Sequence, residues 1–156
     1  MTPFKLIISF VIFSLLFIGG CTVKRPQRYG MIIGIKKEKI DYYKKLHKNP
    51  WKGVLDQIDR SHIRNFSIWL VEYKKDEFLL FGYFEYDGDN FEKDMEAMAK
   101  DPETIRWWKE TDPCQIPIPT AKTGEHWVMM EEVFYHDKDY PDARLMPKPK
   151  RIQREK

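Results

Sequence analysis

The sequence contains few cysteines, no histidine cluster and little net charge. Its two cysteines, Cys21 and Cys114, are too few for the disulfide network that staples small secreted domains. None of the four histidines lies at metal-ligand spacing from another histidine or from a cysteine, so we predict no metal site. The formal net charge of +3 in 156 residues is not the basic footprint of a nucleic-acid-binding protein, and we expect no nucleic-acid partner.

Long apolar runs are absent except at the start of the chain. Residues 6–18 are apolar apart from two serines, with Lys5 before them and a Gly-Gly-Cys ending after them. As a helix this run would be about 20 Å long, short of the roughly 30 Å hydrocarbon core of a bilayer. We therefore predict a signal peptide over residues 1–20, with a permanent signal anchor as the alternative.

The ending FIGGC of this run resembles the lipobox of bacterial lipoproteins, in which the cysteine thiol is acylated. Cys21 is then the expected lipidation site, and several acyl chains on one residue anchor a protein stably. We expect a membrane-anchored lipoprotein that faces the periplasm or the cell exterior. By analogy with the sorting rule of some Gram-negative bacteria, Thr22 in place of aspartate favours the outer over the inner membrane.

Three segments follow the predicted signal peptide. Residues 21–28 form a polar tether, residues 29–136 suffice for one small domain with one core, and residues 137–156 form a basic tail. The tail combines proline and charge with few apolar groups, so we expect it to be disordered. With Cys21 assigned to lipidation, Cys114 is interpreted as a small buried hydrophobe rather than a reactive thiol.

Within the domain, the period of the apolar residues alternates between strand-like and helix-like. Asn49 is the expected cap of a second helical piece, with Pro50 at its first position. The order βαββαβ predicts an α+β, ferredoxin-like antiparallel sheet with its helices on one face, whose other face needs a partner or a ligand. Strands are predicted over residues 29–35, 64–73, 77–86 and 127–136, and helices over 37–48, 50–58, 89–100 and 103–112.

His47 is the candidate acid–base residue. It lies four positions after Tyr43 on one helical face, just before the Asn49-Pro50 break, which we expect to place it near the mouth of a cavity. An imidazole with a pKa of about 6.5 can both give and take a proton near neutrality. The alternative is a surface or capping histidine.

Trp107 and Trp108 are the candidate platform for a sugar ring. Adjacent helical positions diverge by about 100°, so one indole is expected in the core and the other in a cleft. A flat indole can cover the apolar face of a sugar while its N–H donates to a hydroxyl. Core packing of both rings is the alternative.

Several of these residues together resemble the L-rhamnose mutarotase family. The matching features, in order and spacing, are Tyr43, His47, Asn49-Pro50, residues 65–70, Trp107-Trp108 and residues 131–135, and they span roughly residues 29–135. The resemblance implies a homodimer of the dimeric α/β-barrel type, with sheet faces paired, that interconverts the α and β anomers of L-rhamnose without a cofactor. It also implies that His47 is the proton donor and that Tyr43, Trp107 and Trp108 contact the sugar.

One position departs from the family pattern. Phe66 stands where the family commonly has a further sugar-contacting tyrosine, so one hydroxyl for the substrate is missing. Losing such a contact shifts the preference among sugars more than the type of reaction, which leaves L-rhamnose, another 6-deoxy sugar or an ordinary hexose open as substrates. A non-catalytic carbohydrate-binding lipoprotein and a haem-degrading or cofactor-independent monooxygenase of the same fold are the alternative functions.

Overall fold

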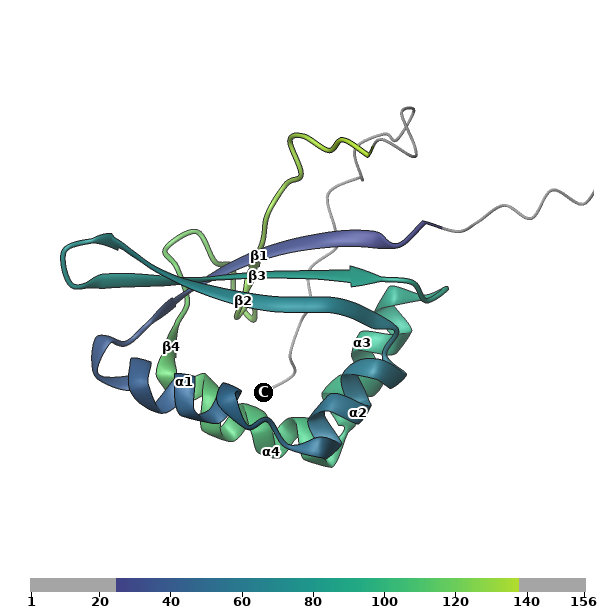
Figure 1. The fold of residues 1–156 in the computed structure, drawn as a ribbon, viewed down its shortest axis with the longest axis horizontal. Coiled ribbons are helices and arrows are strands. Elements are labelled where there is room, and N and C mark those ends of the chain that lie inside the picture. Colours follow the sequence, from purple (N-terminus) through teal and green to yellow (C-terminus); the bar gives the residue numbers. More distant parts are fainter. Residues whose placement is uncertain (1–24, 138–156) are drawn as a thin grey trace, which may run out of the picture.

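The computed structural model describes residues 25–137 (Figure 1). The predicted signal peptide, Cys21, half of the tether and nearly all of the basic tail lie outside these residues, so those expectations stay predictions. None of the helices within residues 25–137 combines the length and the apolar character that a membrane span requires.

One antiparallel sheet forms a layer of the molecule (Figure 1). β1 (Gln27–Ile35) pairs with β3 (Glu77–Tyr86), and β3 pairs with β2 (Ile63–Lys74). Two short strands, β4 (Gln115–Ile116) and β5 (Val128–Met129), pair with the other edge of β1. Where β4 meets β1, a Cβ on Gly34 would lie 2.8 Å from the backbone oxygen of Ile116, so this close approach requires glycine.

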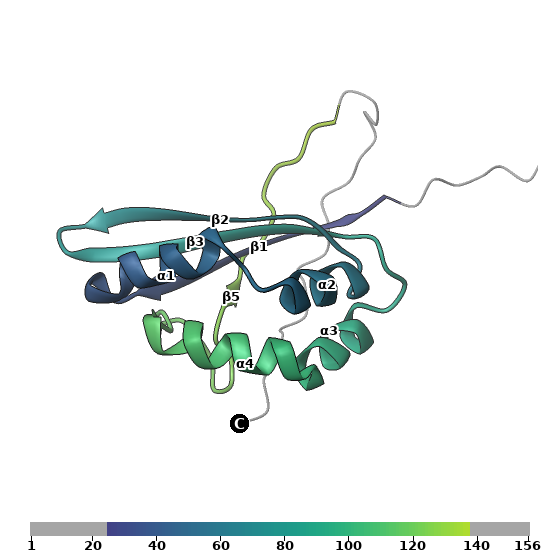
Figure 2. The same cartoon turned by 60° about the horizontal axis from the view of Figure 1, so that its bottom comes forward.

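Four α-helices lie on one face of the sheet (Figures 1 and 2). Short 3₁₀ turns precede the first of them and follow the last. The predicted α+β architecture with the order βαββαβ is thus confirmed, with β4 as an additional strand. The helices are α1 (Ile40–Lys48), α2 (Lys52–Arg60), α3 (Phe91–Lys100) and α4 (Pro102–Thr111), and the 3₁₀ turns are Lys37–Lys39 and Asp112–Cys114.

The predicted break at Asn49-Pro50 is confirmed, because α1 ends at Lys48 and α2 begins at Lys52. The predicted cap is wrong. Trp51 occupies the N-cap position of α2 and no side chain caps this helix. Pro50 therefore precedes the helix instead of opening it, and the three residues Asn49, Pro50 and Trp51 connect α1 to α2.

The second helical region is likewise two helices joined at a proline. Asn90 caps α3 by accepting a hydrogen bond from the backbone N–H of Lys93. Asp101 caps α4, since its carboxylate accepts from the backbone N–H of Thr104 at 2.8 Å, and Pro102 is the first helical residue. Both caps favour the start of a helix at these positions, because they satisfy backbone donors that have no partner within the helix.

The last predicted strand, residues 127–136, is wrong beyond Met129. One backbone hydrogen bond continues the pairing, from the N–H of Met130 to the oxygen of Gly30 on β1 at 2.8 Å. Beyond Met130 the segment is attached to β1 by side chains. Arg28 on β1 makes two hydrogen bonds to the Glu132 carboxylate, at 2.7 and 2.9 Å, and its guanidinium lies 3.3 Å from the centre of the Tyr135 ring. An alternating pattern in the sequence cannot distinguish this attachment from strand pairing.

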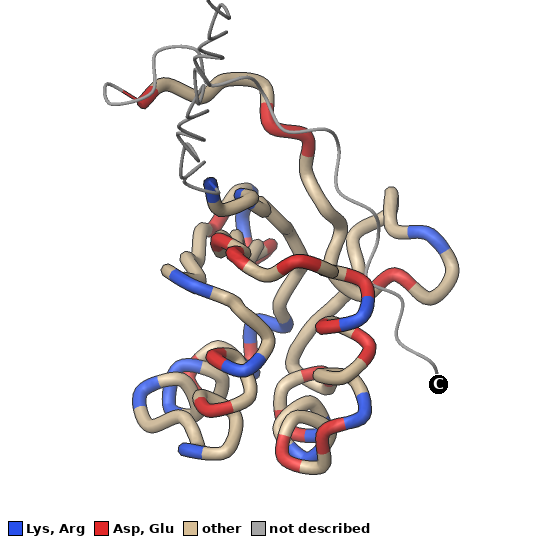
Figure 3. The backbone as a smooth tube through the Cα atoms, turned by 90° about the vertical axis from the view of Figure 1, so that its right-hand side faces the viewer, with Lys and Arg blue, Asp and Glu red and all other residues tan. Residues whose placement is uncertain are grey.

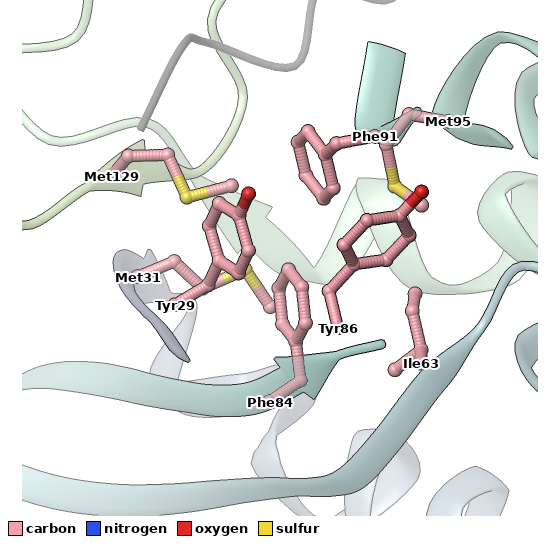
Figure 4. Close-up of a cluster of buried hydrophobic side chains, with 8 residues drawn as sticks. All are labelled: Tyr29, Met31, Ile63, Phe84, Tyr86, Phe91, Met95 and Met129. Atoms are coloured by element: carbon pink, nitrogen blue, oxygen red, sulfur yellow. The ribbon is translucent and has the colours of Figure 1, made fainter. Parts of the chain in front are cut away.

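The interior between sheet and helices contains two clusters of buried side chains. In the first, which we call the Tyr86 cluster, the rings of Tyr29, Phe84 and Phe91 stack (Figure 4). The second, which we call the Tyr43 cluster, is smaller. The Tyr86 cluster consists of Tyr29, Met31, Ile63, Phe84, Tyr86, Phe91, Met95 and Met129, and the Tyr43 cluster of Ile33, Ile35, Tyr43, Leu80 and Cys114. Cys114 is 1% exposed, as predicted for a small buried hydrophobe.

Within residues 25–137, no helix covers the opposite face of the sheet (Figure 1). Trp69, Val71 and Tyr73 on β2 are each about half exposed there, whereas acidic and basic residues are interspersed along the helical layer (Figure 3). Large exposed apolar side chains grouped on one strand are typical of an interaction surface.

Candidate active site

A cavity of about 140 Å³ lies between the sheet and the helices. Its wall includes members of both clusters, among them Phe84 and Met95 of the Tyr86 cluster and Tyr43 of the other. A larger cleft of about 780 Å³ shares part of this wall, including Tyr43, His47 and Trp107. The space therefore lies where the two clusters meet, and most of its lining is apolar.

His47 is positioned at the cavity by the last turn of α1. Its ring nitrogen Nδ1 lies 2.9 Å from the backbone oxygen of Tyr43. Because a carbonyl oxygen can only accept, Nδ1 carries the proton in this hydrogen bond, and the neutral ring then has its lone pair on Nε2. The side chain is half-buried, and burial lowers its pKa below the ordinary 6.5, with a smaller opposing effect of the Tyr43 carbonyl. Burial thus favours the neutral form of the His47 imidazole at pH 7.

Tyr43 holds His47 in a second way, through ring stacking. The two ring centres are 4.1 Å apart with the planes inclined by 29°. The Tyr43 side chain is buried, and its hydroxyl oxygen accepts a hydrogen bond from Nε2 of Gln115 at 3.2 Å. The spacing of four residues therefore creates one unit, in which Tyr43 fixes both the tautomer and the plane of the imidazole.

The paired tryptophans both border the cavity. Trp107 is buried, and its ring lies edge-on to His47 at 5.1 Å and to Trp51 at 5.2 Å. Trp108 is only partly buried. Trp107 is thus the more buried ring and Trp108 the more exposed one, and Trp107 is core and cavity wall at once.

Phe66 on β2 also borders the cavity and is 39% exposed. Its ring meets the ring of Phe84 edge-on at 5.8 Å. The structure thus brings together all of the sugar-site residues that the sequence suggested. They are Tyr43, His47, Phe66, Trp107 and Trp108. Their roles in catalysis and binding stay predictions.

Three further residues of the wall, Gln115, His126 and Trp127, were not anticipated. Gln115 is buried on β4, and its Oε1 lies 2.6 Å from Nε2 of His126. The same His126 nitrogen lies 3.5 Å from a carboxylate oxygen of Asp112. Gln115 and His126 come from a proline-rich stretch without periodicity, so no local signal in the sequence marks them, and Trp127 is the first residue of the last predicted strand.

Besides His47, the sequence has three histidines, His62, His126 and His136. Of these, His126 is part of the cavity wall and His62 is not. Within residues 25–137, no group of three or more His, Cys, Asp and Glu side chains is arranged to hold a metal ion.

The matches to known proteins cover the part of the chain that forms this fold and cavity. A family model described as L-rhamnose mutarotase matches residues 28–136. A relative from Oceanobacillus iheyensis named L-rhamnose mutarotase is 30% identical over 117 residues, which cover 71% of this chain and 99% of the relative. The crystal structure of an L-rhamnose mutarotase from Formosa agariphila, 18% identical, covers 71% of this chain and 99% of its own with a TM-score of 0.53, and shares the fold. The chain belongs to the L-rhamnose mutarotase family.

Proposed function

We propose that this protein is a sugar mutarotase that interconverts the α and β anomers of L-rhamnose or a related hexose. Family membership supports the reaction class. The observation that carries the proposal is His47, a neutral imidazole with Nδ1 engaged by the Tyr43 carbonyl, at a cavity walled by indole rings. We propose no cofactor, because opening and closing a hemiacetal ring needs only proton transfers.

In the proposed mechanism, Nε2 of His47 takes the proton of the anomeric hydroxyl O1. The C1–O5 bond then breaks, C1 becomes an aldehyde, and the ring oxygen O5 receives a proton from a hydroxyl donor, either water or Tyr43. After rotation about the C1–C2 bond, O5 attacks the opposite face of the aldehyde and loses its proton, and His47 returns a proton to O1. One histidine is thus the base of ring opening and the proton donor of ring closure.

For substrate binding, we propose that Trp107 and Trp108 cover the apolar face of the sugar and that Tyr43 contacts a sugar oxygen. Phe66 supplies apolar contact where the family commonly has a hydroxyl. The preference among sugars is therefore expected to differ from that of relatives with tyrosine at this position. Phe66→Tyr should shift the ratio of exchange rates for L-rhamnose and its epimers, and an unchanged ratio would show that this position does not select the sugar.

Saturation-transfer NMR of anomeric exchange tests the function directly. At catalytic concentration the wild-type protein should accelerate exchange of L-rhamnose or of another sugar in a panel of 6-deoxy and ordinary hexoses. Binding without acceleration for every sugar would instead support the non-catalytic carbohydrate-binding alternative. A Soret shift on adding haem would support the monooxygenase alternative, which otherwise lacks a supporting observation.

We also propose that the protein is a homodimer joined through the uncovered sheet face. Trp69, Val71 and Tyr73 support this, because a second copy would remove their half-exposed side chains from water. Light scattering after size exclusion should give twice the monomer mass, and Val71→Lys should reduce it. A monomeric wild type would contradict the proposal.

Membrane anchoring through Cys21 remains a proposal from the FIGGC ending. Labelled palmitate should enter the wild-type protein in bacteria and should not enter Cys21→Ala, which should stay as uncut precursor. Label that persists in the variant would exclude Cys21 as the acylated residue. Fractionation of the membranes then tests the outer-membrane assignment.

A further inference from the structure

We infer that Gln115 and His126 are positioning residues that set Tyr43 as a hydrogen-bond donor to the sugar. With Asp112 they form a chain of polar contacts, Asp112–His126–Gln115–Tyr43, which we call the Gln115 chain. The inference deepens the proposed function and rests on it, since the acceptor for the Tyr43 proton is an oxygen of the bound sugar.

The contacts of the Gln115 chain join segments that are far apart in the sequence. Gln115 belongs to β4 and Tyr43 to α1, 72 residues earlier, and their polar atoms lie 3.2 Å apart. His126 precedes β5, and its Nε2 lies 2.6 Å from Oε1 of Gln115. Tyr43, Gln115 and His126 all border the cavity, so the chain ends at the space proposed for the sugar.

The direction of these hydrogen bonds follows from Asp112. Its carboxylate oxygen lies 3.5 Å from Nε2 of His126. A ring nitrogen that faces a carboxylate is favoured with a proton and disfavoured with a lone pair, so Nε2 of His126 carries a proton. That N–H donates to Gln115, whose carbonyl oxygen must then face His126 and whose NH₂ group must face Tyr43.

The orientation of the amide decides what Tyr43 can do. Because the Tyr43 oxygen accepts from the Gln115 amide, the hydroxyl proton points to another acceptor. In the reverse orientation, the amide oxygen of Gln115 would face Tyr43 and accept its hydroxyl proton. Tyr43 could then only accept a hydrogen bond from the sugar. A hydroxyl committed to donation suits the proposed reaction, in which a sugar oxygen gains electron density as the ring opens.

Gln115→Glu tests the direction of the chain, because a carboxylate can only accept and would take the Tyr43 proton. We expect kcat/KM for anomer exchange to fall roughly three- to tenfold, the equivalent of one neutral hydrogen bond. Gln115→Met removes the amide donor without accepting the Tyr43 proton, so it should lower kcat/KM less than Gln115→Glu does. In a Tyr43→Phe background both substitutions should change kcat/KM by less than about twofold, because residues that act through one group are not additive.

A purely structural role of Gln115 would give the same loss in both backgrounds, together with a lower melting temperature, and this result would overturn the inference. A second readout does not depend on activity or on variant folding. The ¹⁵N shift of Nε2 in wild-type His126 should be that of a protonated ring nitrogen, and an unprotonated Nε2 would overturn the direction of the chain. A wild type without anomer exchange but with a protonated Nε2 would refute the proposed function, and with it the sugar as acceptor, while leaving the direction of the hydrogen bonds established.

Discussion

Each core cluster contains a tyrosine that is paired with a histidine, Tyr86 with His62 and Tyr43 with His47, and the two pairs have different roles. In the Tyr86 cluster, the Tyr86 hydroxyl donates to the Asp94 carboxylate at 2.6 Å and accepts from the backbone N–H of Asn90 at 2.9 Å. His62 lies 2.9 Å from the same Asp94 oxygen. Both partners of Tyr86 come from α3 and its cap, so this pair fastens a helix to the sheet.

The pair at the cavity is held by different groups. His47 is held by the carbonyl and ring of Tyr43, and the Tyr43 hydroxyl is held by the neutral amide of Gln115. Burial lowers the pKa of His47, and the Tyr43 carbonyl opposes this shift only in part. The difference suggests that a tyrosine–histidine pair is structural where a carboxylate closes the network, and is suited to proton transfer where neutral groups position it beside a cavity.

Replacing each histidine by alanine should give the largest difference in exchange rate between the two pairs. His47→Ala should lower the rate of enzymatic anomer exchange about 10²–10⁴-fold, the usual contribution of general acid–base catalysis. Because His62 is not part of the cavity wall, the control His62→Ala should leave the exchange rate unchanged. Saturation transfer gives the rates, and thermal melts report folding. If His47→Ala melts like the wild type and exchanges anomers at the same rate, the proposed mechanism is wrong.

Removing one aromatic ring near each pair compares stability with binding. Trp107→Ala and Phe91→Ala each truncate a buried ring and should each cost about 3–5 kcal/mol in the free energy of unfolding. Only Trp107→Ala should also weaken sugar binding, because Phe91 does not border the cavity. Urea titration and sugar titration by NMR measure the two effects. Equal loss of binding in both variants would show that the effect is general loosening of the core.

Removing each hydroxyl should give opposite results for stability and activity. Tyr86→Phe deletes a hydrogen bond to a carboxylate and should cost about 1.5–3 kcal/mol in the free energy of unfolding, with exchange unchanged. Tyr43→Phe deletes a contact to a neutral amide and should cost about 0.5–1.5 kcal/mol, with slower exchange. Denaturant unfolding beside the exchange assay checks both. A larger stability loss for Tyr43→Phe would reverse the assigned roles.

The smallest expected effect is a pH dependence due to His47. Its folded pKa lies below the unfolded value of about 6.5, so its stabilising contribution is complete above pH 6.5 and is lost as the pH falls below it. In the same range the base becomes protonated, and kcat/KM should decline below pH 6.5 and stay level from there to pH 8. Melting curves of the wild type and His47→Gln across this range isolate the contribution. A decline centred above pH 6.5 would contradict the burial argument.

Much of this site was predictable because its central pair is local. Tyr43 and His47 are one helical turn apart, and the proline after them ends the helix, so their contact follows from spacing alone. The cap of α2 and the extent of the last strand were not predictable. Trp51 rather than Asn49 occupies the cap position, and beyond Met130 the Arg28 side chain, rather than backbone pairing, attaches the segment to β1.

The sequence by itself determined the order of strands and helices, the breaks at Pro50 and Pro102, and the pairing of Tyr43 with His47. Each depends on residues a few positions apart, whose apolar period and backbone restrictions act within one element. Only the tertiary structure decided that Trp107 is core and cavity wall at once, and that Gln115 meets Tyr43 across 72 residues. Contacts of this kind depend on how β4 packs beside β1 and α1, and the period of neighbouring residues contains no information about that packing.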